Sequence, residues 1–246
     1  MQRLTFEDIM MVEEDFEGVE VPMHHITHLS FLRADIHSHT LPPLLEHFPN
    51  LTHFSYMHRC REEIPYPFIP LFIRDGILHL QHSLEELIIV DREKDPEEEW
   101  ELNWNEETHE EVIIGEGVIK PGYFAFGSLT GFQRLRRLEA TVFTLVGLIP
   151  RLVFNDGGAA VLEERLKQKV GLVESFPESL EELVLWNCSE DVRGVVSFLF
   201  DKRRWGQLRK LKIVDLVFSG TFDVEDRLLW QTEGNSLGLV VTARID

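Results

Sequence analysis

Cysteine is scarce in this chain: only Cys60 and Cys188 occur among its 246 residues. Two cysteines cannot build a disulfide framework, and their scarcity favours a reducing compartment. Long apolar runs are also missing, because no stretch approaches the ~18 residues that a membrane-spanning helix needs. The first twenty residues are acidic, where a signal peptide would carry basic and then apolar residues. We therefore expect an intracellular protein, cytoplasmic or nuclear, with no membrane contact.

Basic residues are outnumbered by acidic ones, 24 against 43, which gives a formal net charge of −19. Nucleic-acid binding depends on a basic surface that neutralises phosphates, so this composition argues against a nucleic-acid partner. Residues 91–112 contain eleven acidic and two basic side chains, and residues 1–20 contain seven and one. We interpret both stretches as solvated segments, and the alternative is a docking site for a basic partner.

Signatures of catalysis are few. Cys60 has no paired base that the sequence can place, and Cys188 is expected to satisfy a turn. No glycine-rich stretch has the spacing of a phosphate-binding loop. Histidine is confined to the first half of the chain, where eight of the eleven fall between His24 and His58, and none follows His109. We expect a protein that is not an enzyme and that needs no cofactor.

One motif keeps an enzymatic alternative open. The run Asp35-Ile-His37-Ser-His39-Thr40 resembles the first metal-ligand motif of the polymerase-and-histidinol-phosphatase family of barrel hydrolases. In that family two imidazoles on alternate strand residues bind one metal ion, which activates water. The resemblance implies a metal-dependent phosphoesterase with Asp35, His37 and His39 as ligands. Later strands would have to supply further ligands, and the second half of the chain has no histidine.

What the chain does contain is a repeat. The pattern apolar-x-x-apolar-x-apolar occurs six times, each time preceded by a bulky apolar leader. The patterns begin at Ile26, Leu51, Leu84, Leu135, Leu180 and Leu208. Their leaders are Met23, Phe48, Leu80, Phe132, Phe176 and Trp205. Such a unit cannot bury its apolar face alone, so neighbouring units must stack. We predict one α/β solenoid domain over residues 1–246, with a curved parallel sheet of about six to seven strands and helices or turns on its convex side.

Between the repeats, changes of period and composition predict the other elements. Helices are expected over residues 42–48, 68–80, 161–170, 192–200 and 222–230, and a last, atypical strand over 237–243. Residues 1–22 read as an acidic N-terminal segment. Residues 91–122 read as an acidic and glycine-rich inserted loop, and residues 216–246 as a C-terminal cap.

Two segments carry a second family resemblance. Phe48-Pro-Asn-Leu51-Thr-His-Phe54-Ser-Tyr56 and Phe176-Pro-Glu-Ser-Leu180-Glu-Glu-Leu183-Val-Leu185-Trp-Asn-Cys188 resemble leucine-rich repeats of the cysteine-containing kind, which occur in F-box proteins. The irregular repeat lengths are similar to divergent fungal forms. The resemblance implies a module that recognises substrates for a ubiquitin ligase. Residues 1–22 are too short and acidic for an F-box, so an adaptor would be reached through a partner or a missing segment. A truncated relative with no specific partner is the remaining alternative.

Alternate residues of each predicted strand should line the concave face and bind another protein. The residues we expect in that contact are Trp186, Val184, Glu182, Ile88, Glu86, Arg137, Glu139, Lys210 and Lys212. Tryptophan is the residue type most enriched at binding hot spots. The alternative is that Trp186 and the residues at the same position of the other repeats are buried beneath the turn that follows each strand. His28 and His53 occupy the same position in adjacent repeats. We expect a stacked polar pair there, with a metal-binding or pH-sensing pair as the alternative.

Overall fold

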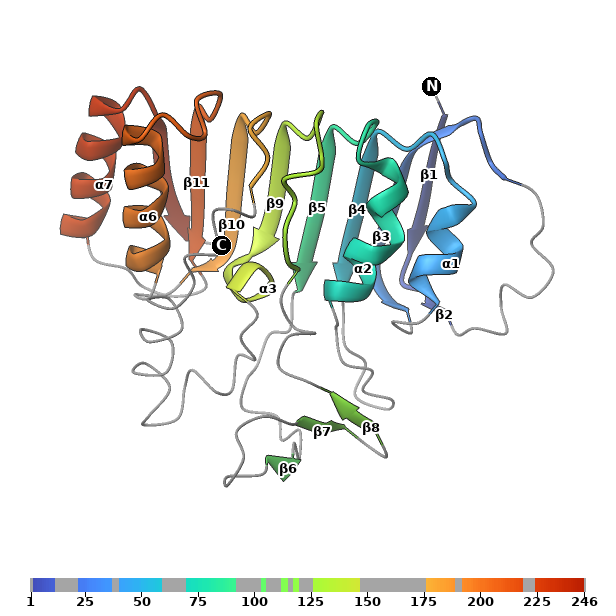
Figure 1. Cartoon of the computed structure of the whole chain (residues 1–246). Helices are drawn as coiled ribbons and strands as arrows, with labels where there is room; N and C mark the ends of the chain where they lie inside the picture. The colour runs from blue at the N-terminus through green and yellow to red at the C-terminus, as the bar shows by residue number, and fades with distance from the viewer. Residues whose placement is uncertain are drawn as a thin grey trace.

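A parallel sheet runs through the whole computed structural model, which describes residues 2–11, 22–36, 40–58, 70–91, 103–104, 112–114, 117–119, 126–146, 176–188, 192–218 and 224–245. Its strands follow one another in chain order (Figure 1). They are β1 (Gln2–Glu7), β3 (Ile26–Ile36), β4 (His53–His58), β5 (Glu86–Asp91), β9 (Arg137–Thr141), β10 (Glu182–Cys188), β11 (Ile213–Phe218) and β12 (Val240–Ile245). The short β2 (Met10–Met11) pairs beside the end of β3, so the sheet has nine strands. The chain is therefore α/β with an open parallel sheet, which is compatible with a solenoid.

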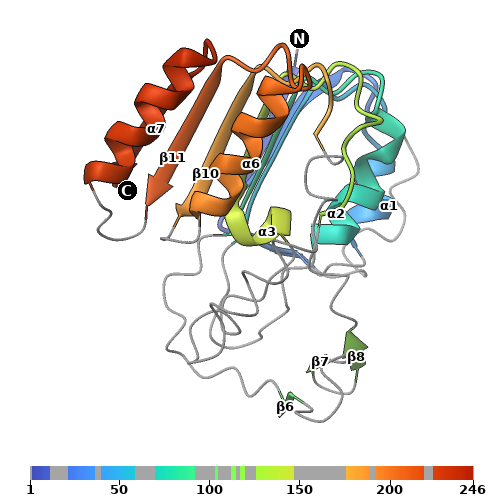
Figure 2. The same cartoon turned by 60° about the vertical axis from the view of Figure 1, so that its left-hand side comes forward.

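Helices lie along one face of this sheet (Figures 1 and 2). They are α1 (Leu41–Glu46), α2 (Pro70–Ile77) with a 3₁₀ turn at Leu78–Leu80, α3 (Val142–Val146), α6 (Val192–Arg204) and α7 (Val224–Ser236). α1 begins with prolines in its first turn, where a missing N–H costs nothing. α6 buries the predicted apolar stripe and ends in three basic residues, which suit a helix C-terminus. α1, α2, α6 and α7 confirm four of the expected helices, α3 was not expected, and the fifth expected helix, over residues 161–170, lies outside the described ranges.

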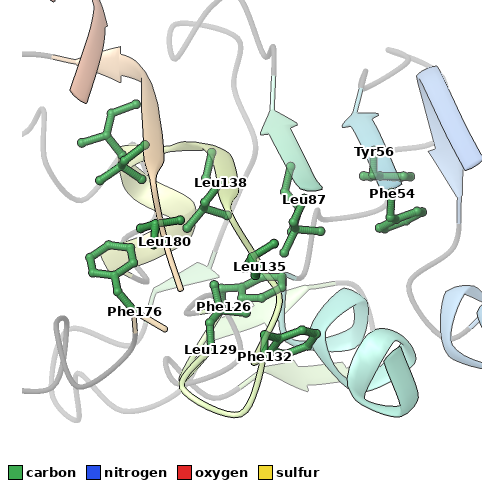
Figure 3. Close-up of a cluster of buried hydrophobic side chains, with 14 of the residues drawn as sticks. Phe54, Tyr56, Leu87, Phe126, Leu129, Phe132, Leu135, Leu138, Phe176 and Leu180 are labelled. Carbon is green, nitrogen blue, oxygen red and sulfur yellow. The ribbon is translucent and has the colours of Figure 1, made fainter. Parts of the chain in front are cut away.

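The core fills the space between the sheet and the helices. In each repeat the first apolar residue is buried at or just before the start of the strand, and the second and third point inward from it. Leu87 and Leu138 lie on neighbouring strands above Leu135 and Phe132 (Figure 3). The leaders Phe48, Leu80, Phe132 and Phe176 are buried as well. Stacking of identical positions thus provides the burial that no single repeat could achieve.

The expected number of strands is wrong, because the N-terminus contributes a strand of its own. Residues 2–7 form β1, which pairs in parallel with β3 so that Leu4 lies beside Leu29 and Phe6 beside Phe31. The rings of Phe6 and Phe31 stack with centroids 5.3 Å apart. Part of the segment that we read as acidic and solvated is therefore the first strand of the sheet. Its apolar residues extend the core, and its polar residues face the other way.

The last repeat is also shifted from its predicted position by three residues. Leu183 lies beside Val214 and Leu185 beside Leu216, so the strand pattern begins at Leu211. Leu208 then takes the place of the leader and is buried, whereas Trp205 is 72% exposed. The expectation that Trp205 leads this repeat is wrong, because Leu208 and Leu211 both fit the same spacing. The proposed C-terminal cap at residue 216 consequently starts inside β11.

A series of backbone bonds supports the shifted frame. Where each strand begins, an amide donates to the carbonyl of the equivalent residue in the preceding repeat. Glu181 donates to Arg136 at 2.7 Å, and Lys212 donates to Glu181 at 2.8 Å. The same bonds join Thr52 to Thr27 and Arg136 to Glu85. Lys212 is therefore the equivalent of Glu181, one residue after the first apolar position.

The predicted inserted loop contains a small separate sheet. β6 (Asn103–Trp104), β7 (Val112–Ile114) and β8 (Gly117–Ile119) pair in antiparallel fashion. Among the described helices, none is long and apolar enough to cross a membrane.

Candidate functional site

The sheet has a second face, opposite the helices, which we call the open face. It consists of three columns of side chains that the strand register aligns from β1 to β12. The first column is Arg3, His28, His53, Glu86, Arg137, Glu182, Ile213 and Val240. The second is Thr5, Ser30, Ser55, Ile88, Glu139, Val184, Asp215 and Thr242. The third, which alternation along each strand places two residues after the second, is Glu7, Leu32, Met57, Val90, Thr141, Trp186, Val217 and Arg244.

Most of the predicted partner-binding residues lie together on this face. Glu86 and Ile88 come from β5, Arg137 and Glu139 from β9, and three others from β10: Glu182, Val184 and Trp186. Lys210 and Lys212 do not belong to it, and their assignment to the strand is wrong because both precede β11. The Nζ of Lys212 instead bonds Glu181 at 2.6 Å, at the edge where the strands begin. This bond is the first cause that lowers the pKa of the Glu181 carboxyl.

Arg137 is the centre of an ion-pair cluster on the open face. Its guanidinium lies 3.0 Å from Glu139, 3.3 Å from Glu182 and 3.6 Å from Glu86. One carboxylate comes from its own strand and the others from the two neighbouring strands. Since three acidic groups surround one basic group, the cluster keeps an excess of negative charge. Arg137 and the two cross-strand glutamates are partly exposed, so this charge faces solvent.

Next to this cluster lies an apolar group that is separate from the main core. We call it the outer cluster: Val90, Val184, Trp186 and Val217, with Ile88 packed against it. Trp186 is only 9% exposed. Its indole N–H donates to Glu139 at 2.7 Å, and the Arg244 guanidinium lies 5.4 Å from its ring centroid. Trp186 thus stabilises the open face from within, and Ile88 is the more accessible apolar side chain.

The outer cluster is continued by polar contacts toward the last strand. Arg244 bonds Asp215 at 3.1 Å, and the Thr242 hydroxyl donates to the same carboxylate at 2.5 Å. Together with Trp186 these contacts connect four neighbouring strands, β9 to β12. These contacts could not be predicted from the sequence, because they depend on the corrected register of β11 and on the position of β12.

His28 and His53 form the stacked pair that the repeat predicts. Their ring centroids are 3.9 Å apart with an interplanar angle of 9°. Each ring nitrogen Nδ1 lies next to the hydroxyl of the preceding threonine, at 2.9 Å for Thr27 and 2.8 Å for Thr52. Burial is the first cause that lowers the pKa of His28, and the neighbouring His53 is the second. A stacked polar pair is therefore confirmed.

The alternative hydrolase motif is only partly visible. Asp35 is buried near the end of β3, beside Met10 of β2. His37 and His39 lie outside the described residues. Within the part of the chain that is described, no set of three or more His, Cys, Asp or Glu side chains is arranged to hold a metal ion.

Cys188 is a structural residue rather than a nucleophile. It is buried at the end of β10, and its thiol donates to the Leu185 carbonyl at 3.2 Å. Burial raises the pKa of the thiol to about 12. Burial therefore disfavours the thiolate, which is the form that acts as nucleophile or metal ligand. Its expected role in satisfying a turn agrees with this geometry.

The sequence signal that could have revealed β1 is its alternation. Leu4 and Phe6 face the core, while Arg3, Thr5 and Glu7 face the open side. This period of two is typical of a strand with one wet face.

Comparison with other proteins gives no relative: the chain matches no family model, no curated protein and no solved structure.

Proposed function

We propose that this chain is a leucine-rich-repeat solenoid that binds another protein through its open face and performs no catalysis. The strands follow chain order in parallel, and equivalent positions stack from one repeat to the next. A solenoid of this kind presents an extended surface to which each strand contributes a few side chains. No described helix covers the open face in Figures 1 and 2.

The observation that supports the proposal most strongly is the ion-pair cluster around Arg137. Three strands place Glu86, Arg137 and Glu182 in a row, and all three side chains are partly exposed. Exposed ion pairs contribute little to the free energy of unfolding, so the stability of the fold does not explain a cluster on a solvent-exposed face. With more acidic than basic groups, it suits a lysine or arginine of a partner. Charge complementarity of this kind increases the specificity of binding and the rate of association.

Apolar side chains next to the cluster complete a mixed surface. Ile88, Met57 and Leu32 are partly exposed in neighbouring columns of β5, β4 and β3. Protein interfaces combine an apolar centre with a polar surround, and this face offers both within adjacent strands. We therefore propose a partner segment with both basic and apolar side chains.

The finer proposal concerns the class of protein. The cysteine-type repeats that end at Tyr56 and Cys188 resemble those of F-box proteins, which use them to recognise substrates of ubiquitin ligases. The burial of the Cys188 thiol against a backbone carbonyl supports this kind of repeat. We propose that the partner is a protein substrate captured in this way.

Reversing the charge of the cluster tests the proposal. Wild-type protein and the variant Glu86→Lys/Glu182→Lys are used to capture proteins from native lysate, which mass spectrometry identifies. The matched control is Glu46→Lys/Glu178→Lys, since both residues are exposed and lie off the open face. The proposal predicts a protein that the wild type and the control retain and the cluster variant loses. Identical captured sets, with equal thermal melts, would reject the open face as the binding site.

A further inference from the structure

Trp205 is the most exposed large apolar side chain in the described part of the chain, with 72% of its surface accessible. It follows α6 directly, and Leu208 is buried in the position of the leader instead. The φ angle of Leu208 is 50°, in the left-handed region that residues other than glycine seldom adopt. The chain thus has a disfavoured backbone conformation at Leu208 while the indole of Trp205 stays in solvent. Backbone strain of this kind is concentrated at functional sites.

The turn that carries Trp205 is fixed by backbone hydrogen bonds. The Gly206 amide donates to the Arg203 carbonyl at 3.1 Å. The Gln207 amide donates to the Lys202 carbonyl at 2.9 Å, and the φ angle of Gly206 is 77°. These two bonds form a Schellman motif, which ends a helix at a left-handed glycine. Since the turn is already ordered, a partner that covers the indole loses little binding free energy to ordering it.

Basic side chains surround this indole. The Lys202 ammonium lies 5.8 Å from the centroid of the Trp205 ring, where a cation is attracted to the ring face. The Nε of Arg209 donates to the Gly206 carbonyl at 2.6 Å, so its guanidinium lies beside the turn. Lys210 follows it, and both side chains are exposed. Residues 201–212 contain six basic side chains and one acidic one, in a chain of net charge −19. We call this set the indole patch: Lys202, Trp205, Arg209 and Lys210.

The carboxylates closest in the structure to the end of α6 are already paired. Asp201 and Glu233 both bond the guanidinium of Arg204, which lies outside the patch. Within the ranges that the structure describes, neither Arg209 nor Lys210 takes part in an ion pair. The indole patch therefore keeps a local excess of positive charge.

From this arrangement we propose that the indole patch is a second docking surface, for an acidic segment of a partner protein that has an apolar side chain among its carboxylates. The apolar side chain covers the indole, and the carboxylates pair with Arg209 and Lys210. Tryptophan and arginine are the residue types most enriched at binding hot spots. α6 ends at the edge where β10 and β11 begin (Figure 1), so this surface is separate from the open face and does not depend on the partner proposed there.

Two other polyanions, nucleic acid and an anionic membrane surface, fit the patch less well. Both present an extended negative surface, and a chain with a net charge of −19 is repelled by such a surface. Their binding depends on neutralising many phosphates, and the patch has only a few cations. A short acidic segment contacts the patch alone and meets positive charge there.

A peptide-binding measurement by fluorescence anisotropy tests the proposal, using the full chain. The probe is a short labelled peptide in which one phenylalanine is flanked by glutamates. One matched probe has alanine for the phenylalanine, and another has glutamine for the glutamates. The wild type should bind the first probe with a Kd below about 1 mM and each matched probe about 10-fold more weakly. Trp205→Ala should weaken binding of the first probe by about 10-fold or more, with an unchanged thermal melt.

A charge-reversal variant and its control complete the test. Arg209→Glu/Lys210→Glu should abolish binding of the first probe. Arg3→Glu/Arg227→Glu changes the net charge equally at two exposed positions outside the patch and should retain binding. Equal binding by wild type and Trp205→Ala, the same loss in the control, or no peptide binding up to about 1 mM would overturn the proposal. Tighter binding of an RNA oligonucleotide or of phosphatidylserine vesicles, lost in Trp205→Ala, would overturn it in favour of that polyanion.

Discussion

The indole N–H of Trp186 donates to the Glu139 carboxylate at 2.7 Å, joining β10 to β9 across the open face. Glu139 also accepts from Arg137 at 3.0 Å, so a largely buried carboxylate is satisfied from two sides. The ion-pair cluster and the outer cluster are therefore coupled through one side chain. If one of these donors were removed, the carboxylate would still be buried away from water but would lose a hydrogen bond that offsets the free-energy cost of that burial.

The first prediction concerns this bond. Trp186→Phe keeps most of the ring but removes the donor, and it should lower the free energy of unfolding by about 1–3 kcal/mol in urea. Trp186→Ala also leaves a cavity in the outer cluster and should cost about 3–5 kcal/mol. In a background of Glu139→Leu, where the acceptor is absent, Trp186→Phe should cost clearly less. Equal costs in both backgrounds would show that the bond contributes nothing.

The second prediction concerns the frame of the last repeat. Leu211→Ala should lower the free energy of unfolding by about 2–5 kcal/mol, since the side chain is fully buried at the first apolar position. Trp205→Ala should change it by no more than about 0.5 kcal/mol, because that ring is 72% exposed. Urea denaturation measures both. A large cost at Trp205 would restore the frame that begins at Leu208, in which Trp205 is the buried leader.

The third prediction concerns the thiol of Cys188. In a Cys60→Ser background, iodoacetamide at pH 8 should alkylate Cys188 far more slowly in the folded protein than in urea, because burial shields it and raises its pKa to about 12. The native state holds this proton more tightly than the unfolded state does. Stability should therefore fall as the pH rises above about 8.5, the value of a free thiol, and Cys188→Ala should reduce that fall. Equally fast alkylation with and without urea would contradict the buried position.

The fourth prediction concerns the tautomers of His28 and His53. Side-chain ¹⁵N NMR at pH 8 should show the proton on Nδ1 of both rings, because each threonine hydroxyl donates to a backbone carbonyl and can only accept from its histidine. Thr27→Val should shift His28 toward the other tautomer and leave His53 unchanged. A proton on Nε2 in both wild-type rings would contradict this hydrogen bonding.

Much of the fold could be predicted from the repeat itself. Five of the six patterns lie where their spacing put them, because bulky residues such as Leu84 and Leu180 have no place except the core. The sixth failed because Leu208-x-x-Leu211-x-Ile213 and Leu211-x-x-Val214-x-Leu216 satisfy the same rule. Only the pairing with β10 distinguishes them. β1 was not predicted, because the acidic composition of residues 1–20 favoured a solvated segment although Leu4 and Phe6 alternate with polar residues.

The candidate face was predictable in outline and not in detail. Alternation places Ile88, Arg137 and Glu182 on one side of the sheet, and the register confirms it. The burial of Trp186 could not be predicted from its position in the repeat, because the side chains around its ring include Val217 of β11 and Arg244 of β12. Contacts between side chains far apart in sequence appear only when the strands have been placed.

Contact between a protein partner and the open face can be detected with a photo-crosslinker introduced at single positions. Benzoylphenylalanine replaces Ser55, which is partly exposed on the open face, or Glu46, which is exposed on α1. After irradiation in native cells, a partner bound to the open face should give a covalent protein adduct from position 55 and none from position 46. Adducts from position 46 alone, or from neither position, would contradict this contact.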